Sequence, residues 1–148
     1  LLLADLQVYK TKLKNFQWNA LGRGSLELQN KFQRLYASCS SYSDKTARRI
    51  IVLGYHPISR LKDYLELSTL EESLPKLPVT SMVKKITEDI SHLLKDIRRS
   101  LKLALSLDNY GTVDLLTYLT ANLEEDLSGL QSLQKEEGTY LNTIHNKI

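Results

Sequence analysis

The side chains that could carry chemistry in this chain are scattered basic and acidic groups, not a recognisable catalytic set. No nucleophile pattern, glycine-rich phosphate loop or zinc-ligand spacing occurs in the 148 residues. His56 has no second histidine or acid at ligand spacing, and a lone histidine such as His92 is typical of a structural or solvent-facing role. The single cysteine, Cys39, excludes an intrachain disulfide and suits a reducing compartment. We therefore assign no catalytic residue.

The charge balance is mildly positive. Lys and Arg number 20 against 17 Asp and Glu, which gives a formal net charge of +3. This balance permits contact with nucleic-acid phosphates but does not demonstrate it. Lys10, Lys12 and Lys14 are expected to form a solvated face, with a DNA-phosphate patch as the alternative. No apolar run approaches the ~20 residues of a membrane span, so no membrane partner is expected.

Helices are the elements expected to position these side chains. Leucine is abundant, glycine and proline are scarce, and apolar residues recur at three- and four-residue steps. This spacing predicts helices over residues 2–21, 26–53, 59–67, about 80–107 and from 112 onward. Ser25, Thr80 or Ser81, and Thr112 are the predicted N-caps. The length fits a single domain, residues 1–148, and because the chain does not begin with Met we expect an N-terminal tail upstream.

The stretch from Asn15 to Pro57 carries a pattern of motifs in a fixed order. It reads NFxWN at 15–19, a short glycine-containing turn, LxLxxKFxxLY at 26–36, AxRI at 47–50 and LGxxP at 53–57. This pattern resembles the Dps family (DNA-binding proteins from starved cells), the mini-ferritins. The resemblance implies an all-α, ferritin-like four-helix bundle with a short extra helix in the long crossover between its second and third helices. It also implies a hollow shell of twelve copies, iron oxidation inside the shell, and often DNA binding outside it.

The chain departs from the family pattern at the positions of the iron site. Gln17 and Gln29 stand where family members usually have histidines. Asp44 keeps the family's aspartate, and Arg48 stands where the family has a glutamate. In the family these four groups form one site across a twofold interface, with the histidines from one subunit and the carboxylates from its partner. Trp18, beside the altered position, is interpreted as an interface or core aromatic.

These replacements predict that the family's ferroxidase centre is lost. Ferrous iron prefers imidazole nitrogen and carboxylate oxygen, whereas a guanidinium has no lone pair to offer. We therefore expect no metal at this position, although iron as cargo of the shell interior is compatible with the sequence. Asp44 and Arg48, four residues apart, are predicted to form an ion pair. The alternative is a displaced iron site, for which the candidate inward acids are Glu124, Glu125 and Asp126.

A second fragment, TxDLL at residues 112–116, also resembles the family. The resemblance implies that Asp114 lines a threefold pore that admits iron into the shell. The neighbouring acids of this funnel correspond here to Tyr110 and Ser106, so the acidic ladder is reduced to Asp114. The same aspartate could instead be an ordinary first-turn acid that stabilises a helix N-terminus. The residues leave these two roles open.

The predicted function is that of a homo-dodecameric shell that binds the DNA phosphate backbone without sequence specificity and protects DNA under stress, in the cytoplasm and associated with the nucleoid. One alternative is an iron-storing ferroxidase that uses a displaced site. Another is a four-helix bundle with an unrelated partner. The three differ in what they predict: salt-sensitive retardation of DNA, rapid protein-dependent oxidation of ferrous iron, or a monomeric mass in solution.

Overall fold

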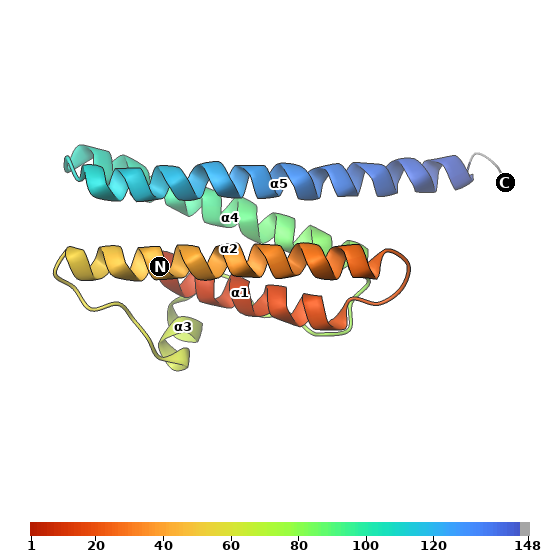
Figure 1. The fold of residues 1–148 in the computed structure, drawn as a ribbon, viewed down its shortest axis with the longest axis horizontal. Helices are drawn as coiled ribbons and strands as arrows, with labels where there is room; N and C mark the ends of the chain where they lie inside the picture. Colours follow the sequence, from red (N-terminus) through yellow and green to blue (C-terminus); the bar gives the residue numbers. More distant parts are fainter. Residues whose placement is uncertain (146–148) are drawn as a thin grey trace.

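The computed structural model describes the backbone of residues 1–145 and the side-chain surroundings of residues 1–136. That range contains five helices and no strand: α1 (Leu2–Asn19), α2 (Ser25–Val52), α3 (Leu61–Leu67), α4 (Val79–Ser106) and α5 (Tyr110–His145). The four long helices lie alongside one another, and short α3 sits in the crossover between α2 and α4 (Figure 1). The predicted all-α four-helix bundle with an extra crossover helix is confirmed. The predicted domain extends to residue 148, and its last three residues lie outside the described range.

The long helices pair as two hairpins. α1 packs along α2 and α4 packs along α5, while contacts of α1 with α4 and of α2 with α5 close the bundle. The chain crosses the length of the bundle between α2 and α4, so these two helices run in the same direction (Figure 1). None of the helices in the described range is both long enough and apolar enough to cross a membrane.

The helices share a cluster of buried apolar side chains. Phe16 of α1 and Phe32 of α2 contact each other in it, with ring centroids 6.0 Å apart. Burying one Leu, Ile or Phe side chain contributes roughly 1.5–3 kcal/mol, so this cluster dominates the stability of the bundle. Cys39 lies within the cluster, and its thiol donates a hydrogen bond to the Leu6 carbonyl at 3.2 Å. Burial raises the pKa of this thiol to about 12, which makes it unreactive.

Two helices start differently from the predicted caps. Gly24, with a φ of 77°, occupies the N-cap of α2, and Ser25 is already the first helical residue. Glycine adopts this positive φ without strain because it has no Cβ, so backbone geometry closes the turn instead of a serine hydroxyl. α4 follows directly on Pro78. Neither Thr80 nor Ser81 caps it, because both lie inside the helix.

The N-terminus of α5 is capped by Asn109, so the prediction of Thr112 is also wrong. Asn109 Oδ1 accepts a hydrogen bond from the Thr112 backbone N–H at 3.3 Å. The Thr112 hydroxyl accepts from Arg49 Nε at 3.0 Å, and Arg49 Nη2 donates to Asn109 Oδ1 at 2.7 Å. One guanidinium therefore ties the end of α2 to the start of α5.

The start of α1 holds the crossover in place. Asp5 is fully buried, and its Oδ1 accepts hydrogen bonds from the Thr69 N–H at 2.6 Å and the Ser68 hydroxyl at 2.8 Å. His92 Nε2 on α4 lies 2.7 Å from Thr69 Oγ1 and 3.2 Å from Asp96 Oδ2. The segment after α3 is therefore fixed to both α1 and α4, which agrees with the structural role predicted for His92.

One of the three lysines predicted to be solvated is buried in the bundle. Lys12 Nζ lies 2.8 Å from Asp89 Oδ2, and the two side chains are only 5% and 11% exposed. Burial raises the pKa of the Asp89 carboxyl, and the nearby Lys12 ammonium opposes that shift. The expectation of a common solvated face is wrong for Lys12, because this residue faces α4 while Lys10 and Lys14 face Tyr36 of α2.

Candidate functional site

The four positions of the predicted iron site do not meet within one chain. Gln17, near the end of α1, and Gln29, in the first turns of α2, lie at one end of the hairpin. Asp44 and Arg48 lie toward the other end of α2. Fifteen residues separate Gln29 from Asp44, which is about 22 Å along a helix. The structure therefore presents two separate half-sites.

The amide half-site consists of Lys14, Gln17, Gln29 and Gln33. Lys14 Nζ donates hydrogen bonds to Gln17 Oε1 at 2.9 Å and to Gln33 Oε1 at 3.0 Å. The same ammonium lies 4.1 Å from the centroid of the Tyr36 ring, in a cation–π contact. These partners are all neutral. The half-site thus holds a positive charge that no carboxylate pairs with in the described part of the chain.

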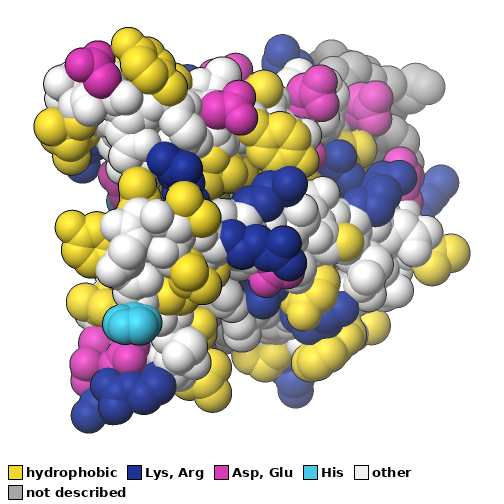
Figure 2. All heavy atoms as spheres, turned by 60° about the vertical axis from the view of Figure 1, so that its left-hand side comes forward, with side chains coloured by type: hydrophobic (Ala, Val, Ile, Leu, Met, Phe, Trp, Pro, Cys, Tyr) yellow, Lys and Arg dark blue, Asp and Glu magenta, His cyan; other side chains and the backbone are white. Residues whose placement is uncertain are grey.

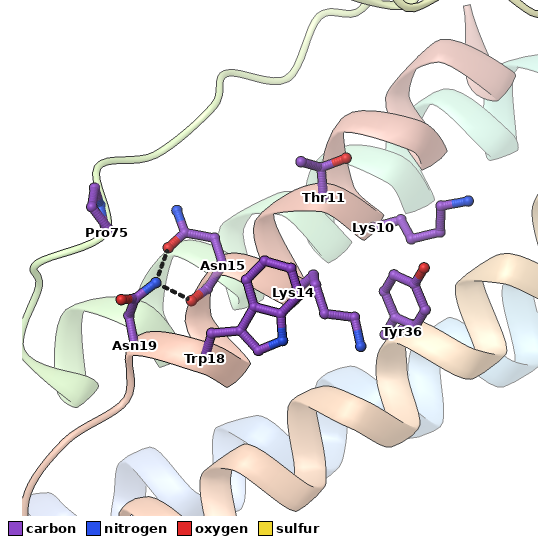
Figure 3. Close-up of a pocket in the computed structure, with 8 residues that line it drawn as sticks. All are labelled: Lys10, Thr11, Lys14, Asn15, Trp18, Asn19, Tyr36 and Pro75. Atoms are coloured by element: carbon purple, nitrogen blue, oxygen red, sulfur yellow. Dashed lines mark hydrogen bonds between the residues drawn. The ribbon is translucent and has the colours of Figure 1, made fainter.

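A hollow of about 450 Å³ opens beside Lys14. Figure 3 shows Lys14 between the rings of Trp18 and Tyr36, with Lys10 also directed toward Tyr36. Trp18 is 72% exposed, so it is not a core aromatic, and its interface role stays a prediction. None of the described residues that line the hollow is acidic. Its wall therefore combines lysine and aromatic side chains with neutral polar ones.

The turn between α1 and α2 orients Gln29. Its Nε2 donates to the Ala20 carbonyl at 2.8 Å, which fixes the amide and leaves Oε1 without a partner among the described residues. Gln17 Oε1, by contrast, accepts from Lys14. The half-site therefore presents an ammonium and amide oxygens where the family pattern would place imidazole nitrogens.

The carboxylate half-site consists of Asp44 and Arg48, which line a hollow of about 400 Å³ together with Ser41 and Lys45. Both side chains are exposed, and the ion pair predicted between them is not formed. Lys45 lies over the Tyr118 ring, 5.4 Å from its centroid. Figure 2, turned so that the C-terminal end of α2 comes forward, shows Lys and Arg side chains gathered near the middle of the visible face. None of the described Lys and Arg side chains forms an ion pair with the Asp44 carboxylate.

This donor set does not fit ferrous iron. Only Asp44 offers a ligand that iron prefers, and the other positions carry two neutral amides and a permanent cation. The alternative acids do not replace it. Glu124 pairs with Arg98 at 3.1 Å, and burial raises the pKa of Asp126, which disfavours its charged form. Neighbouring residues on a helix also point about 100° apart, so Glu124, Glu125 and Asp126 do not converge.

One other group in the described chain brings potential metal ligands together. Donor atoms of Asp5, His92 and Asp96 all lie within 4.8 Å of one another. Sequence reasoning misses this group because Asp5 comes from a different helix, and the four-residue spacing of His92 and Asp96 is its one local signal. Hydrogen bonds from Ser68 and Thr69 already occupy the Asp5 carboxylate. The group therefore serves mainly as the anchor of the crossover.

Asp114 is exposed near the start of α5. Because α5 begins at Tyr110, two residues earlier than predicted, Asp114 lies beyond the first turn, which contains no acidic residue. Its interpretation as an ordinary first-turn acid is therefore wrong. Tyr110 and Ser106, at the positions of the family's further pore acids, are exposed as well. The role of Asp114 in a threefold pore stays a prediction.

Comparisons with known proteins agree on one family. Residues 2–137 match the ferritin-like domain family. The chain is 32% identical over 123 residues to DNA protection during starvation protein 2 of Bacillus anthracis, covering 83% of this chain and 84% of that protein. It is 29% identical to the DNA protection during starvation protein of Brevibacillus brevis, covering 88% of this chain and 87% of that protein.

Solved structures give the same result. A Dps protein from Bacillus brevis superposes with a TM-score of 0.86 at 29% identity and covers 88% of each chain. Dps from Staphylococcus aureus gives a TM-score of 0.87 at 26% identity, covering 90% of this chain and 89% of that one. The chain therefore belongs to the ferritin-like family and, within it, to the Dps family, as the pattern from Asn15 to Pro57 predicts.

Proposed function

We propose that this chain is the subunit of a twelve-copy Dps-type shell that binds DNA without sequence specificity and shields it under stress, and that its intersubunit ferroxidase centre is lost. The observation that carries the loss is the content of the two half-sites. Gln17 and Gln29 supply no imidazole, and Arg48 replaces a carboxylate with a cation. A fixed cation about 4 Å from a single positive charge costs roughly 4 kcal/mol at an effective dielectric constant near 20, and a dication about doubles that cost.

DNA binding is supported by the relatives and by the charge. The relatives from Bacillus anthracis and Brevibacillus brevis are named for DNA protection, and twelve copies would multiply the +3 charge of one chain. Of the three lysines predicted to contact phosphates, Lys12 no longer qualifies because its ammonium is buried against Asp89. Lys10 and Lys14 keep donors near the surface. Cytoplasmic location with nucleoid association belongs to the same proposal.

Gel retardation of duplex DNA in rising salt tests the DNA-binding part. Retardation at low salt that weakens steeply as salt rises is expected, because neutralised phosphates release their counterions. No retardation at low salt would reject DNA binding. Sedimentation velocity tests the shell: a particle of about twelve 16.9 kDa subunits is expected, and a monomer would reject it.

Iron storage through a displaced site is the second candidate function. The convergence of Asp5, His92 and Asp96 within 4.8 Å is the observation that favours it. Ferrous iron would then be the substrate, oxidised by peroxide or oxygen and kept inside the shell. Protein-dependent oxidation that disappears in Asp96→Asn would establish this function. Oxidation that instead disappears in Asp44→Asn would show that the family's own centre is still active and would overturn the proposed loss.

A further inference from the structure

Lys14 and Asp44 are opposite charges that have no ionic partner within the described chain. Two amide oxygens and the Tyr36 ring hold the Lys14 ammonium, and the Asp44 carboxylate is exposed further along α2. The two cannot meet in one chain, because Gln33, which contacts Lys14, lies eleven residues from Asp44. That separation is about 16 Å along the helix. Each charge is therefore available to a second molecule.

Lys14 reaches from α1 to Gln33 of α2, and Asp44 lies on the same face of α2 as Gln33. Gln33, Ala37, Ser40 and Asp44 follow one another at three- and four-residue steps, which place side chains on the same stripe of a helix. The outward positions between the charges are small residues, namely Ala37, Ser40 and Ser41. Because the distance between two packed helices depends on the side chains at their contact, this middle section permits close approach of another helix.

We propose that, across the twofold contact of the proposed shell, Lys14 of each copy forms an ion pair with Asp44 of the other. A twofold axis through the middle of the face sets two α2 helices antiparallel and exchanges their ends. Each amide half-site then meets the carboxylate half-site of the neighbouring copy. A twofold contact requires a self-complementary surface, and one positive and one negative group on either side of a small-residue centre provide it.

The inference rests on the proposed shell. It adds the pair of charged side chains that meet at the interface where the family's iron ligands are replaced. The Lys14 ammonium supplies, from the chain itself, a positive charge beside the place where the family pattern puts a metal ion. Arg48 is compatible with this arrangement. Its guanidinium can donate a hydrogen bond to Gln29 Oε1 of the other copy, an atom that has no partner among the described residues of its own chain. Engaged in this contact, Lys14 is no longer a DNA-binding candidate, and Lys10 remains.

Charge reversal tests the pair. Lys14→Glu and Asp44→Lys each place like charges opposite one another, so each single variant should lose the assembled mass in sedimentation velocity at low salt. The double variant restores opposite charges across the interface and should recover that mass. Lys95→Glu, at an exposed lysine of α4, makes the same charge change elsewhere and should assemble like the wild type. Single variants that assemble like Lys95→Glu, or a folded double variant that does not recover, would overturn the pair.

Carbodiimide cross-linking of the wild type tests the contact without relying on variants. The reagent joins an amine to a carboxylate in contact, with loss of water. We expect a covalent dimer on a denaturing gel and a Lys14–Asp44 cross-linked peptide by mass spectrometry, both reduced in Lys14→Gln. A wild-type shell without this cross-link would overturn the inference and leave the proposed function standing. A wild type that stays monomeric would overturn both.

Discussion

Lys12 and Lys14 stand two residues apart on α1 and have opposite surroundings. Lys12 is buried and paired with Asp89 at 2.8 Å, whereas the partners of Lys14 among the described residues are amide oxygens and aromatic rings. The Lys12 charge is neutralised inside its own subunit, so it contributes to the stability of the fold. The Lys14 charge is left with neutral partners, so we expect it to contribute to association between copies. The comparison separates groups that stabilise the bundle from groups that are open to a second copy.

Breaking the buried pair should have the largest effect. Lys12→Met leaves the Asp89 carboxylate buried without its cation, and removing one partner of a buried pair costs about 3–5 kcal/mol. Urea unfolding followed by circular dichroism, at one fixed protein concentration, measures the loss. The double variant Lys12→Met with Asp89→Leu removes both charges and should recover most of it. A loss below about 1 kcal/mol in Lys12→Met would mean that water reaches this pair.

The anchor of the crossover should come next. Asp5→Ala removes a buried carboxylate that accepts hydrogen bonds from Thr69 and Ser68, and each hydrogen bond to a charged group is worth about 1.5–3 kcal/mol. We expect a loss of about 2–3 kcal/mol and faster proteolysis between α2 and α4. Asp63→Ala is the matched control, since it breaks a surface pair with Arg60 and should leave the unfolding free energy nearly unchanged. Equal effects of the two changes would contradict the anchoring role.

Lys14→Met sharpens the comparison with Lys12→Met. Because no ionic partner of Lys14 lies in the described part of its own chain, the dissociated subunit should lose at most about 1 kcal/mol of unfolding free energy. Urea unfolding in dilute, high-salt solution measures this loss, and sedimentation of the same variant at low salt should show weakened assembly. A loss as large as that of Lys12→Met would show that Lys14 belongs to the fold of the single subunit.

Asp126 gives the smallest effect, and its sign depends on pH. Burial raises the pKa of this carboxyl, with Lys31 opposing the shift, so the folded state binds the proton more tightly than the unfolded state does. The resulting stability is present below the pKa of an ordinary aspartate and is lost as pH rises through the folded-state pKa. Asp126→Asn should therefore unfold at higher urea than the wild type at pH 7. The difference should shrink toward pH 4, and a less stable variant at pH 7 would contradict the burial effect.

The helices could be predicted from the sequence, but their exact starts could not. Apolar spacing gives the existence and order of all five because one face of each long helix is buried. The caps depend on local geometry instead. Gly24 takes a positive φ and Asn109 reaches back to the Thr112 N–H. Serine and threonine nearby look equally suitable in the sequence, so the prediction placed the caps one to three residues late.

The candidate site was predictable in position but not in its partners. Motif spacing locates Gln17, Gln29, Asp44 and Arg48, yet nothing local shows that Lys12 turns inward. Its partner Asp89 lies 77 residues away, and only the packing of α1 against α4 brings them together. Helix spacing also suggested a pair between Asp44 and Arg48 that the exposed side chains do not form. An exposed ion pair gains too little free energy to hold two side chains together, so a four-residue spacing alone does not predict that the pair forms.

The shielded sulfur of Cys39 makes the subunit convenient to label. With a pKa of about 12 and no solvent access, the native thiol has almost no thiolate at neutral pH, and thiolate is the form that reacts with alkylating dyes or peroxide. A cysteine engineered on an outer helix face would then be the one coupling point per chain for a fluorophore or spin probe. The natural residue need not be removed first.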